Sequence, residues 1–345
     1  MANDSESNSL IGLCATAKAL RFHAAVIFSE IVQIILALVT LILLLAAILS
    51  YKKYRISLHP NLMLLFANLI FLYAYQYIFI VIVQGRHQLL VYFSSNPCDL
   101  LTPAWLSVVL RVPGYVYVRA FIFSHFALAT ERARATIFAR HYEKEGASYP
   151  LICIVIIWIL TTLETSYVVV QALRDPTFWQ PLVQVSLTAE TNATFQIYMN
   201  FFGLALLIIT AIMDYLLLVE NRKKRLTNTD YSLSRTFQIN ENINVMNFIW
   251  PVDVSYAVVF SIYLAGSTFI RLISNTIAYA QYVAISNILY TVLSMHSIVT
   301  LLLYLRFVRK SRAKVTAVIV EPNDPTRTYF EQLTSQWNIN LKGND

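Results

Sequence analysis

Charged residues and glycine are both scarce in this chain of 345 residues. Charged side chains make up 13% of the sequence, roughly half the share in a soluble domain. Only 7 residues are glycine, and strand-like alternation is weak, which argues against a transmembrane β-barrel. The chain also lacks an HExxH helix, a glycine-rich phosphate loop and a set of three histidines within its apolar stretches. We therefore predict no enzyme, no catalytic residues, no metal site and no cofactor.

Long apolar stretches dominate what is present. Hydrophobic residues make up 57% of the chain, and seven stretches are each long enough to cross a hydrocarbon layer about 30 Å thick. The connections are too short for a second folded domain. The predicted fold is all-α, a seven-transmembrane helix bundle with a segment before it (1–23) and a tail after it (306–345). The predicted spans within the membrane domain (24–305) are 24–50, 61–83, 103–130, 150–171, 196–219, 246–270 and 282–305.

Lysine and arginine sit mostly on alternate connections, which predicts the orientation. If the N-terminus is outside, 19 of the 26 lysines and arginines lie on the inner side and five lie on the outer side. The remaining two, Arg111 and Arg119, lie within the third span. We expect an extracellular N-terminus and a cytoplasmic tail in a multi-pass protein of the plasma membrane. The net charge of +7 then matches the anionic inner leaflet of the lipid bilayer, and we predict no nucleic-acid partner.

Two features of the outer side concern covalent chemistry. Asn192 begins the sequon Asn-Ala-Thr between the fourth and fifth spans, so we predict a glycan on Asn192. Cys14 and Cys98 both lie in outer segments, where an oxidising lumen permits a disulfide. The sequence leaves open whether these two cysteines are bonded or free.

Four polar residues inside the spans are candidate ligand contacts: Arg111, Arg119, Glu164 and His296. A lone charge at the bilayer centre costs at least ~2.5–3.5 kcal/mol on insertion scales, so each charge should have a partner or a function. By depth, Arg111 pairs with Glu164, and Arg119 meets Asp253 or His296 across the bundle. A structural ion pair explains these residues as well as ligand contact does.

Basic residues of the inner connections are candidates for a partner-binding surface. Seven helices with an outer N-terminus resemble the plan of G-protein-coupled receptors, in which Arg132 would turn into the inner mouth of the bundle. Adjacent helical residues point about 100° apart, so Glu131 is not expected to occupy Arg132 fully. The alternative is a positive-inside anchor with a neighbouring acid. The predicted G-protein-facing residues are Glu131, Arg132, Arg134, Arg222, Lys223, Lys224 and Arg225.

Two motifs carry a more specific resemblance. The run ERARAT from Glu131 to Thr136, followed by Tyr142-Glu143, resembles a signature of the nematode serpentine chemoreceptors grouped around class alpha. The segment YSLSRTFQINENI (231–243) resembles a pattern of serpentine receptor class epsilon, with Thr236 where arginine is expected. The resemblance covers the membrane domain and implies a chemosensory receptor for a small-molecule or peptide ligand that signals through a heterotrimeric G protein.

The main alternative is a seven-span transporter or channel, which buried charges would also permit. Missing internal repeats, an odd number of spans and few helix-breaking glycines argue against it.

Overall fold

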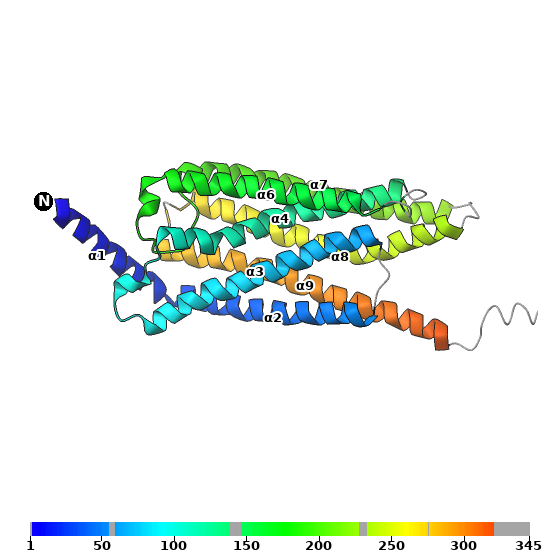
Figure 1. The fold of residues 1–345 in the computed structure, drawn as a ribbon, viewed down its shortest axis with the longest axis horizontal. Coiled ribbons are helices and arrows are strands. Elements are labelled where there is room, and N and C mark those ends of the chain that lie inside the picture. Colours follow the sequence, from blue (N-terminus) through cyan, green and yellow to red (C-terminus); the bar gives the residue numbers. More distant parts are fainter. Residues whose placement is uncertain are drawn as a thin grey trace, which may run out of the picture.

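The computed structural model describes residues 2–54, 59–138, 142, 146–227, 233–274 and 276–320, without the side chains of 2–9, 54, 226–227, 233–241 and 311–320. Within this part of the chain the structure is helical, and its one strand-like pairing joins Thr102 to Leu182. Figure 1 shows the long helices side by side along one axis, with α1 (Ala2–Arg21) at one end. The predicted all-α class is confirmed.

Seven helices are long and apolar enough to cross a membrane, one for each predicted span. The shortest has 27 residues, more than the roughly 20 that a bilayer core requires. Each of the seven helices extends past the inner end of its predicted span. Hydropathy marks the part of a helix that lies in lipid, whereas the hydrogen-bonded helix itself continues beyond it. The seven helices are α2 (Ala24–Tyr54), α3 (Pro60–Phe93), α4 (Ala104–Ile137), α6 (Ser148–Arg174), α7 (Glu190–Thr227), α8 (Leu233–Leu272) and α9 (Tyr279–Val320).

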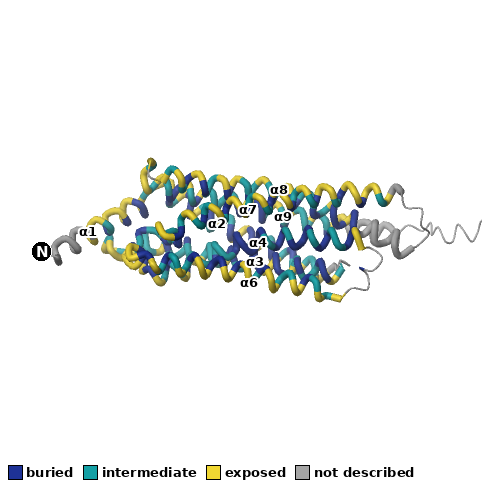
Figure 2. The backbone as a smooth tube through the Cα atoms, turned by 90° about the horizontal axis from the view of Figure 1, so that it is seen from above, coloured by how far each residue is buried: buried dark blue, intermediate teal, exposed yellow. Residues whose placement is uncertain are grey.

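Helix α4 lies at the centre of the bundle. It packs against α3, α6, α7 and α8, and 56% of its most apolar window is buried, against 28–39% for the other spans. Figure 2 shows this concentration of buried backbone along α4. Pro113 lies inside the helix, where surrounding helices make such a break tolerable. The central position explains how α4 can carry several polar side chains that never meet lipid.

Helix α1 was not predicted from the sequence. A disulfide between Cys14 and Cys98 ties it to the turn η1 (Pro97–Leu100), so of the two open alternatives the structure has the bond. Arg21 at the end of α1 is buried and its Nη1 lies 3.2 Å from Glu30 Oε1. Burial lowers the pKa of Arg21, and the attraction of Glu30 opposes this shift. Helix α1 is therefore anchored to the bundle.

We call the end of the bundle that carries α1 the outer end and the opposite end the inner end. These names follow the orientation predicted from the basic residues, and that orientation stays a prediction, as do the boundaries 1–23, 24–305 and 306–345. The described helix α9 runs to Val320, and residues 321–345 lie outside the described part of the chain.

Candidate functional site

A small polar cavity lies in the outer half of the bundle, between α4, α7, α8 and α9. Its volume is about 40 Å³, enough for one or two waters or for a single small polar group. The cavity brings together two of the four predicted ligand contacts, Arg111 and Arg119. Its lining, which we call the outer pocket, consists of Arg111, Tyr115, Val118, Arg119, Leu187, Thr188, Gln196, Asn200, Tyr263, Ser267, Arg271 and Tyr290.

Arg119 is the most buried cation of the outer pocket, with 4% of its surface exposed. Its Nε lies 2.9 Å from Glu164 Oε1, and its two Nη atoms donate to Met199 O at 2.9 Å and Asn200 Oδ1 at 3.0 Å. Gly203 lets α7 approach closely here, because a Cβ at that position would lie 3.2 Å from Ile122 Cδ1 and 3.3 Å from Leu264 Cδ1. An acidic partner inside the bundle was predicted, but the partner is Glu164.

The two predicted ion pairings are therefore wrong. Glu164 Oε1 is occupied by Arg119 and also accepts from Tyr115 OH at 2.6 Å, so it does not pair with Arg111. Arg111 instead lies over the ring of Tyr290, 4.2 Å from its centroid. The pairings were predicted from depth along the helices, but the direction in which each side chain points was not available from the sequence.

Arg271 of α8 was missed as a pocket residue because it stands at the end of a predicted span. Its Nη1 donates to Gln196 Oε1 at 2.6 Å. Among the residues the structure describes, no carboxylate lies within 4.0 Å of Arg111 or Arg271. The outer pocket thus contains three guanidinium groups and one neighbouring carboxylate.

His296, the fourth predicted ligand contact, does not line the outer pocket. It is completely buried deeper in the bundle, with its ring nitrogens 3.4 Å from Tyr73 OH and 3.2 Å from Ser255 Oγ. Phe121 packs against it, with ring centroids 5.5 Å apart. His125 lies in the same cluster, 2.8 Å from Asp253. The sequence placed these residues within spans but could not show that they face one another.

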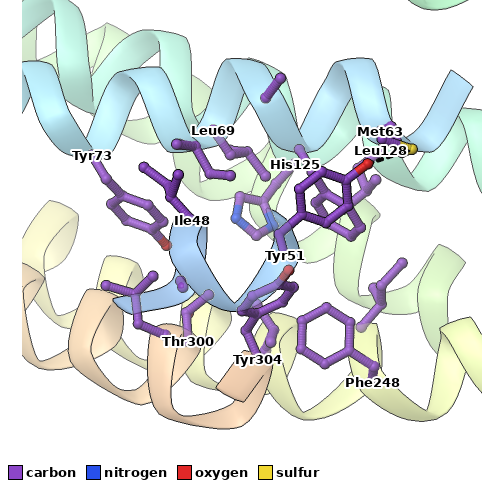
Figure 3. A pocket seen from close by; sticks show the side chains of 17 residues that line it. Ile48, Tyr51, Met63, Leu69, Tyr73, His125, Leu128, Phe248, Thr300 and Tyr304 are labelled. Carbon is purple, nitrogen blue, oxygen red and sulfur yellow. Dashed lines mark hydrogen bonds between the residues drawn. The ribbon is translucent and has the colours of Figure 1, made fainter. Parts of the chain in front are cut away.

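A larger cavity of about 390 Å³ opens toward the inner half, and its lining is almost entirely apolar. Figure 3 shows His125 and Leu128 of α4 on one side of this inner cavity, with Phe248 and Tyr304 on the other. His125 joins the inner cavity to the buried histidine cluster. The cavity offers an apolar volume next to α4 but few polar groups that would orient a ligand.

The predicted G-protein-facing pair is buried at the inner end. Arg132 Nε lies 2.5 Å from Glu131 Oε2, and its Nη atoms donate to Tyr142 OH at 3.0 Å and to Asn242 Oδ1 at 3.3 Å. Tyr142 OH in turn donates to Glu131 Oε1. We call Glu131, Arg132, Tyr142 and Asn242 the inner cluster.

The inner cluster agrees with one expectation and explains a motif. Glu131 occupies only the Nε of Arg132, and the two Nη atoms are left for Tyr142 and Asn242. The Tyr142 hydroxyl is protonated at neutral pH and can donate, and burial raises its pKa further above the ordinary value. The ERARAT run and the tyrosine that follows it in the sequence motif therefore meet in the inner cluster. Thr136, the last residue of the run, donates to Arg132 O within α4.

The remaining basic candidates differ in exposure. Arg134 lies over the ring of Tyr149 at 3.9 Å, and Lys224 donates to Thr136 O at 2.9 Å. Arg222, Lys223 and Arg225 of α7 are exposed at the inner end. These residues surround a closed inner cluster.

The burial of Asn192 argues against the glycan predicted there, and the glycan stays a prediction. This side chain is completely buried, and its Nδ2, the atom that would carry the sugar, donates to Val168 O and Leu187 O at 3.1 and 2.8 Å. Its Oδ1 accepts from Gln196 Nε2 and Ala189 N. Asn192 therefore stabilises the start of α7, and a sequon alone could not reveal this burial.

Seven long apolar helices with α4 at their centre, a polar pocket toward one end and a buried Glu-Arg pair at the other have the architecture of a seven-transmembrane receptor. The family model of the serpentine type 7TM GPCR receptor class ab chemoreceptor matches residues 13–338. The chain belongs to this family of chemoreceptors and is a multi-pass membrane protein. The expected serpentine resemblance is confirmed, whereas the match does not confirm the finer assignment to class epsilon.

Individual relatives agree with the family. Serpentine receptor class beta-17 of Caenorhabditis elegans is 22% identical over 277 residues, covering 78% of this chain and 74% of the relative. Serpentine receptor class alpha-39 of the same organism is 22% identical over 260 residues, covering 73% and 66%. Class alpha/beta-14 is 24% identical over 207 residues, covering 59% and 52%. These are receptor families, which favours a receptor over the transporter or channel alternative.

Proposed function

We propose that this chain is a chemosensory G-protein-coupled receptor of the plasma membrane. It binds a small-molecule or peptide cue in the outer pocket and signals to a heterotrimeric G protein at the inner end. The observation that carries this proposal is that one central helix bears both sites. Arg119 and Arg132 are 13 residues apart on α4, about 20 Å along the helix, and each is held by a buried glutamate.

A column of aromatic rings supports coupling between the two sites. Tyr117, Phe121 and His125 follow one another at four-residue spacing on α4, with centroids 5.2 and 4.7 Å apart. Phe121 also stacks on Phe260 of α8 at 5.1 Å. Because packed interiors switch between discrete arrangements, a ligand that shifts α4 against α8 at the outer pocket would repack this column toward the inner end.

Release of Arg132 is the proposed output step. Asn242 belongs to α8 and donates through Nδ2 to Ala135 O of α4 at 3.1 Å, so the inner cluster holds these two helices together. Separation of α8 from α4 would remove Asn242 from Arg132 and Ala135 and would open Arg132 toward the exposed basic residues of α7. A cationic surface of this kind would dock an intracellular protein partner through charge-assisted hydrogen bonds.

The function is tested by a ligand screen in cells that express the chain, with calcium or cAMP as the readout. Arg132→Ala should abolish the response to any cue that activates the wild type. Since this change leaves Glu131 without its charged partner, responses must be compared at matched surface expression. An unchanged response in Arg132→Ala would contradict the proposal.

Orientation is tested separately with an epitope tag at the N-terminus. We expect antibodies to reach the tag in intact cells. A tag that is reached only after permeabilisation would overturn both the orientation and the assignment of the outer pocket to the extracellular side.

A further inference from the structure

The charges of the outer pocket are unbalanced. Three guanidinium groups line it, and only that of Arg119 has a carboxylate partner among the residues the structure describes. Arg111 and Arg271 line the pocket with partly exposed side chains. Inside a membrane domain, where the effective dielectric constant is low, a cation without a counter-charge is costly and attracts an anion more strongly than it would in water.

Uncharged amide oxygens accept hydrogen bonds from the arginines at positions where carboxylates could have done so. Gln196 Oε1 accepts from Arg271 at 2.6 Å, while Gln196 Nε2 donates away from the pocket to Asn192. Asn200 Oδ1 likewise accepts from Arg119, and its Nδ2 donates to Ser267 and Thr268 at 3.1 and 3.0 Å. Both amides therefore present oxygen to arginine and satisfy the hydrogen bonds without cancelling the positive charge.

The shape of the pocket limits the group that enters it. A volume of about 40 Å³ accommodates a planar group of about three heavy atoms but not a complete ligand of ordinary size. Arg111 lies over the face of the Tyr290 ring, which leaves the edge of its guanidinium available for two parallel hydrogen bonds. Carboxylate is the anionic group that matches both the size and this fork.

We propose that the outer pocket binds the carboxylate group of a small organic acid, with Arg111 and Arg271 as its cationic partners. This inference rests on the proposed function, which it deepens by naming the ligand class. The body of the acid lies toward the outer end, where Thr188 of the connection before α7 lines the pocket. Arg119 remains paired with Glu164, and this pair forms the floor of the outer pocket.

The direct test uses the purified full-length chain in nanodiscs of phosphatidylcholine, which contain no anionic lipid headgroup. Thermal unfolding is followed with hexanoate or benzoate, and with hexanamide, hexylamine and inorganic phosphate as comparisons. Hexanoate and benzoate should raise the midpoint by about 2–4 °C at saturation, because a ligand that binds only the folded state stabilises it. Equal shifts with hexanamide, or a shift with phosphate alone, would overturn the proposal.

Variants then assign the site. Arg111→Gln and Arg271→Gln should each weaken hexanoate binding at least about tenfold, because each removes a charge-assisted hydrogen bond to the carboxylate. Arg174→Gln is the matched control, since Arg174 is exposed at the outer end and does not line the pocket. Equal losses in Arg174→Gln, or none in the pocket variants, would contradict the assignment. If the pocket variants do not fold, the hexanoate and hexanamide comparison on the wild type decides.

Failure of this proposal can be distinguished from failure of the proposed function. Hexanoate that stabilises the wild type without any signal in cells would support the carboxylate site and contradict coupling to a G protein. Neutral cues that signal equally through the wild type and Arg111→Gln would support the receptor function and overturn the carboxylate site.

Discussion

The outer pocket and the inner cluster both place an arginine of α4 next to a glutamate, yet they are built for opposite purposes. In the outer pocket, guanidinium groups outnumber carboxylates, neutral amides serve as acceptors, and a small cavity remains. In the inner cluster, Arg132 is matched by Glu131, Tyr142 and Asn242. The comparison teaches that an incomplete set of charges suits a site that receives a ligand, whereas a complete set suits a contact that must stay closed until it is broken.

Breaking the ion pair at the floor of the outer pocket should have the largest effect. Arg119→Leu leaves Glu164 buried without its cation, and such a change costs about 3–5 kcal/mol. We expect a strong loss of thermal stability in the purified protein. The double variant Arg119→Leu with Glu164→Leu should recover part of this loss, because it removes both charges.

Arg174→Leu provides the control for the loss of an arginine, since Arg174 is exposed. A single Arg119→Leu variant as stable as the wild type would show that the floor of the outer pocket does not depend on the pair. The contrast with the inner cluster would then lose its basis.

Loosening the inner cluster should have an intermediate effect. Tyr142→Phe removes the hydroxyl that donates to Glu131 and accepts from Arg132, but it keeps the ring that packs on His59 at 4.1 Å. Losing these bonds costs the closed state about 1–3 kcal/mol. Signalling without ligand should therefore rise several-fold, as measured by cAMP or calcium at equal surface expression.

Tyr149→Phe is the matched control, because Tyr149 also lies at the inner end and its hydroxyl donates to Thr130 Oγ1 at 3.1 Å. It should leave basal signalling near the wild-type level. Equal basal signalling in Tyr142→Phe and the wild type would contradict a closing role for the inner cluster.

The smallest effects concern the support of the outer pocket by Asn192. Asn192→Gln disturbs the buried hydrogen bonds that lead to Gln196 but keeps an amide, and it should cost about 1 kcal/mol. Thr194→Ala destroys the same sequon but changes an exposed side chain, so it should alter stability by less than about 0.5 kcal/mol. Neither change should alter glycosidase sensitivity on a gel. A glycan that disappears in Thr194→Ala would contradict the buried state of Asn192.

Much of the architecture was predictable because the bilayer imposes a strong constraint. A run of about 20 apolar residues has few alternatives to a spanning helix, since backbone groups in lipid must bond within the chain. All seven predicted spans lie on the seven long helices. Helix α1 was missed because polar residues outside the membrane give no comparable signal, and its position depends on Cys14 and Arg21 contacting distant segments.

The candidate sites were only partly predictable, and the limit was geometric. The motif from Glu131 to Tyr142 identified residues that do gather at the inner end. Arg111, Arg119 and Glu164 were selected as charges within the predicted spans, but their predicted pairing was wrong. A helix turns 100° per residue, so side chains at adjacent positions face different neighbouring helices. The sequence alone does not show which helix each side chain faces.

The sequence by itself determined that this protein lies in a membrane as seven helices, because hydrophobic burial in lipid depends on composition and length along the chain. It also carried a resemblance to the serpentine receptors, which the family model confirms. Only the tertiary structure decided which charges meet. Arg119 reaches Glu164 and leaves Arg111 with Tyr290, and Asn192 is buried despite its sequon. Such contacts join residues far apart in the chain, and their directions are fixed by how the helices rotate and pack against α4.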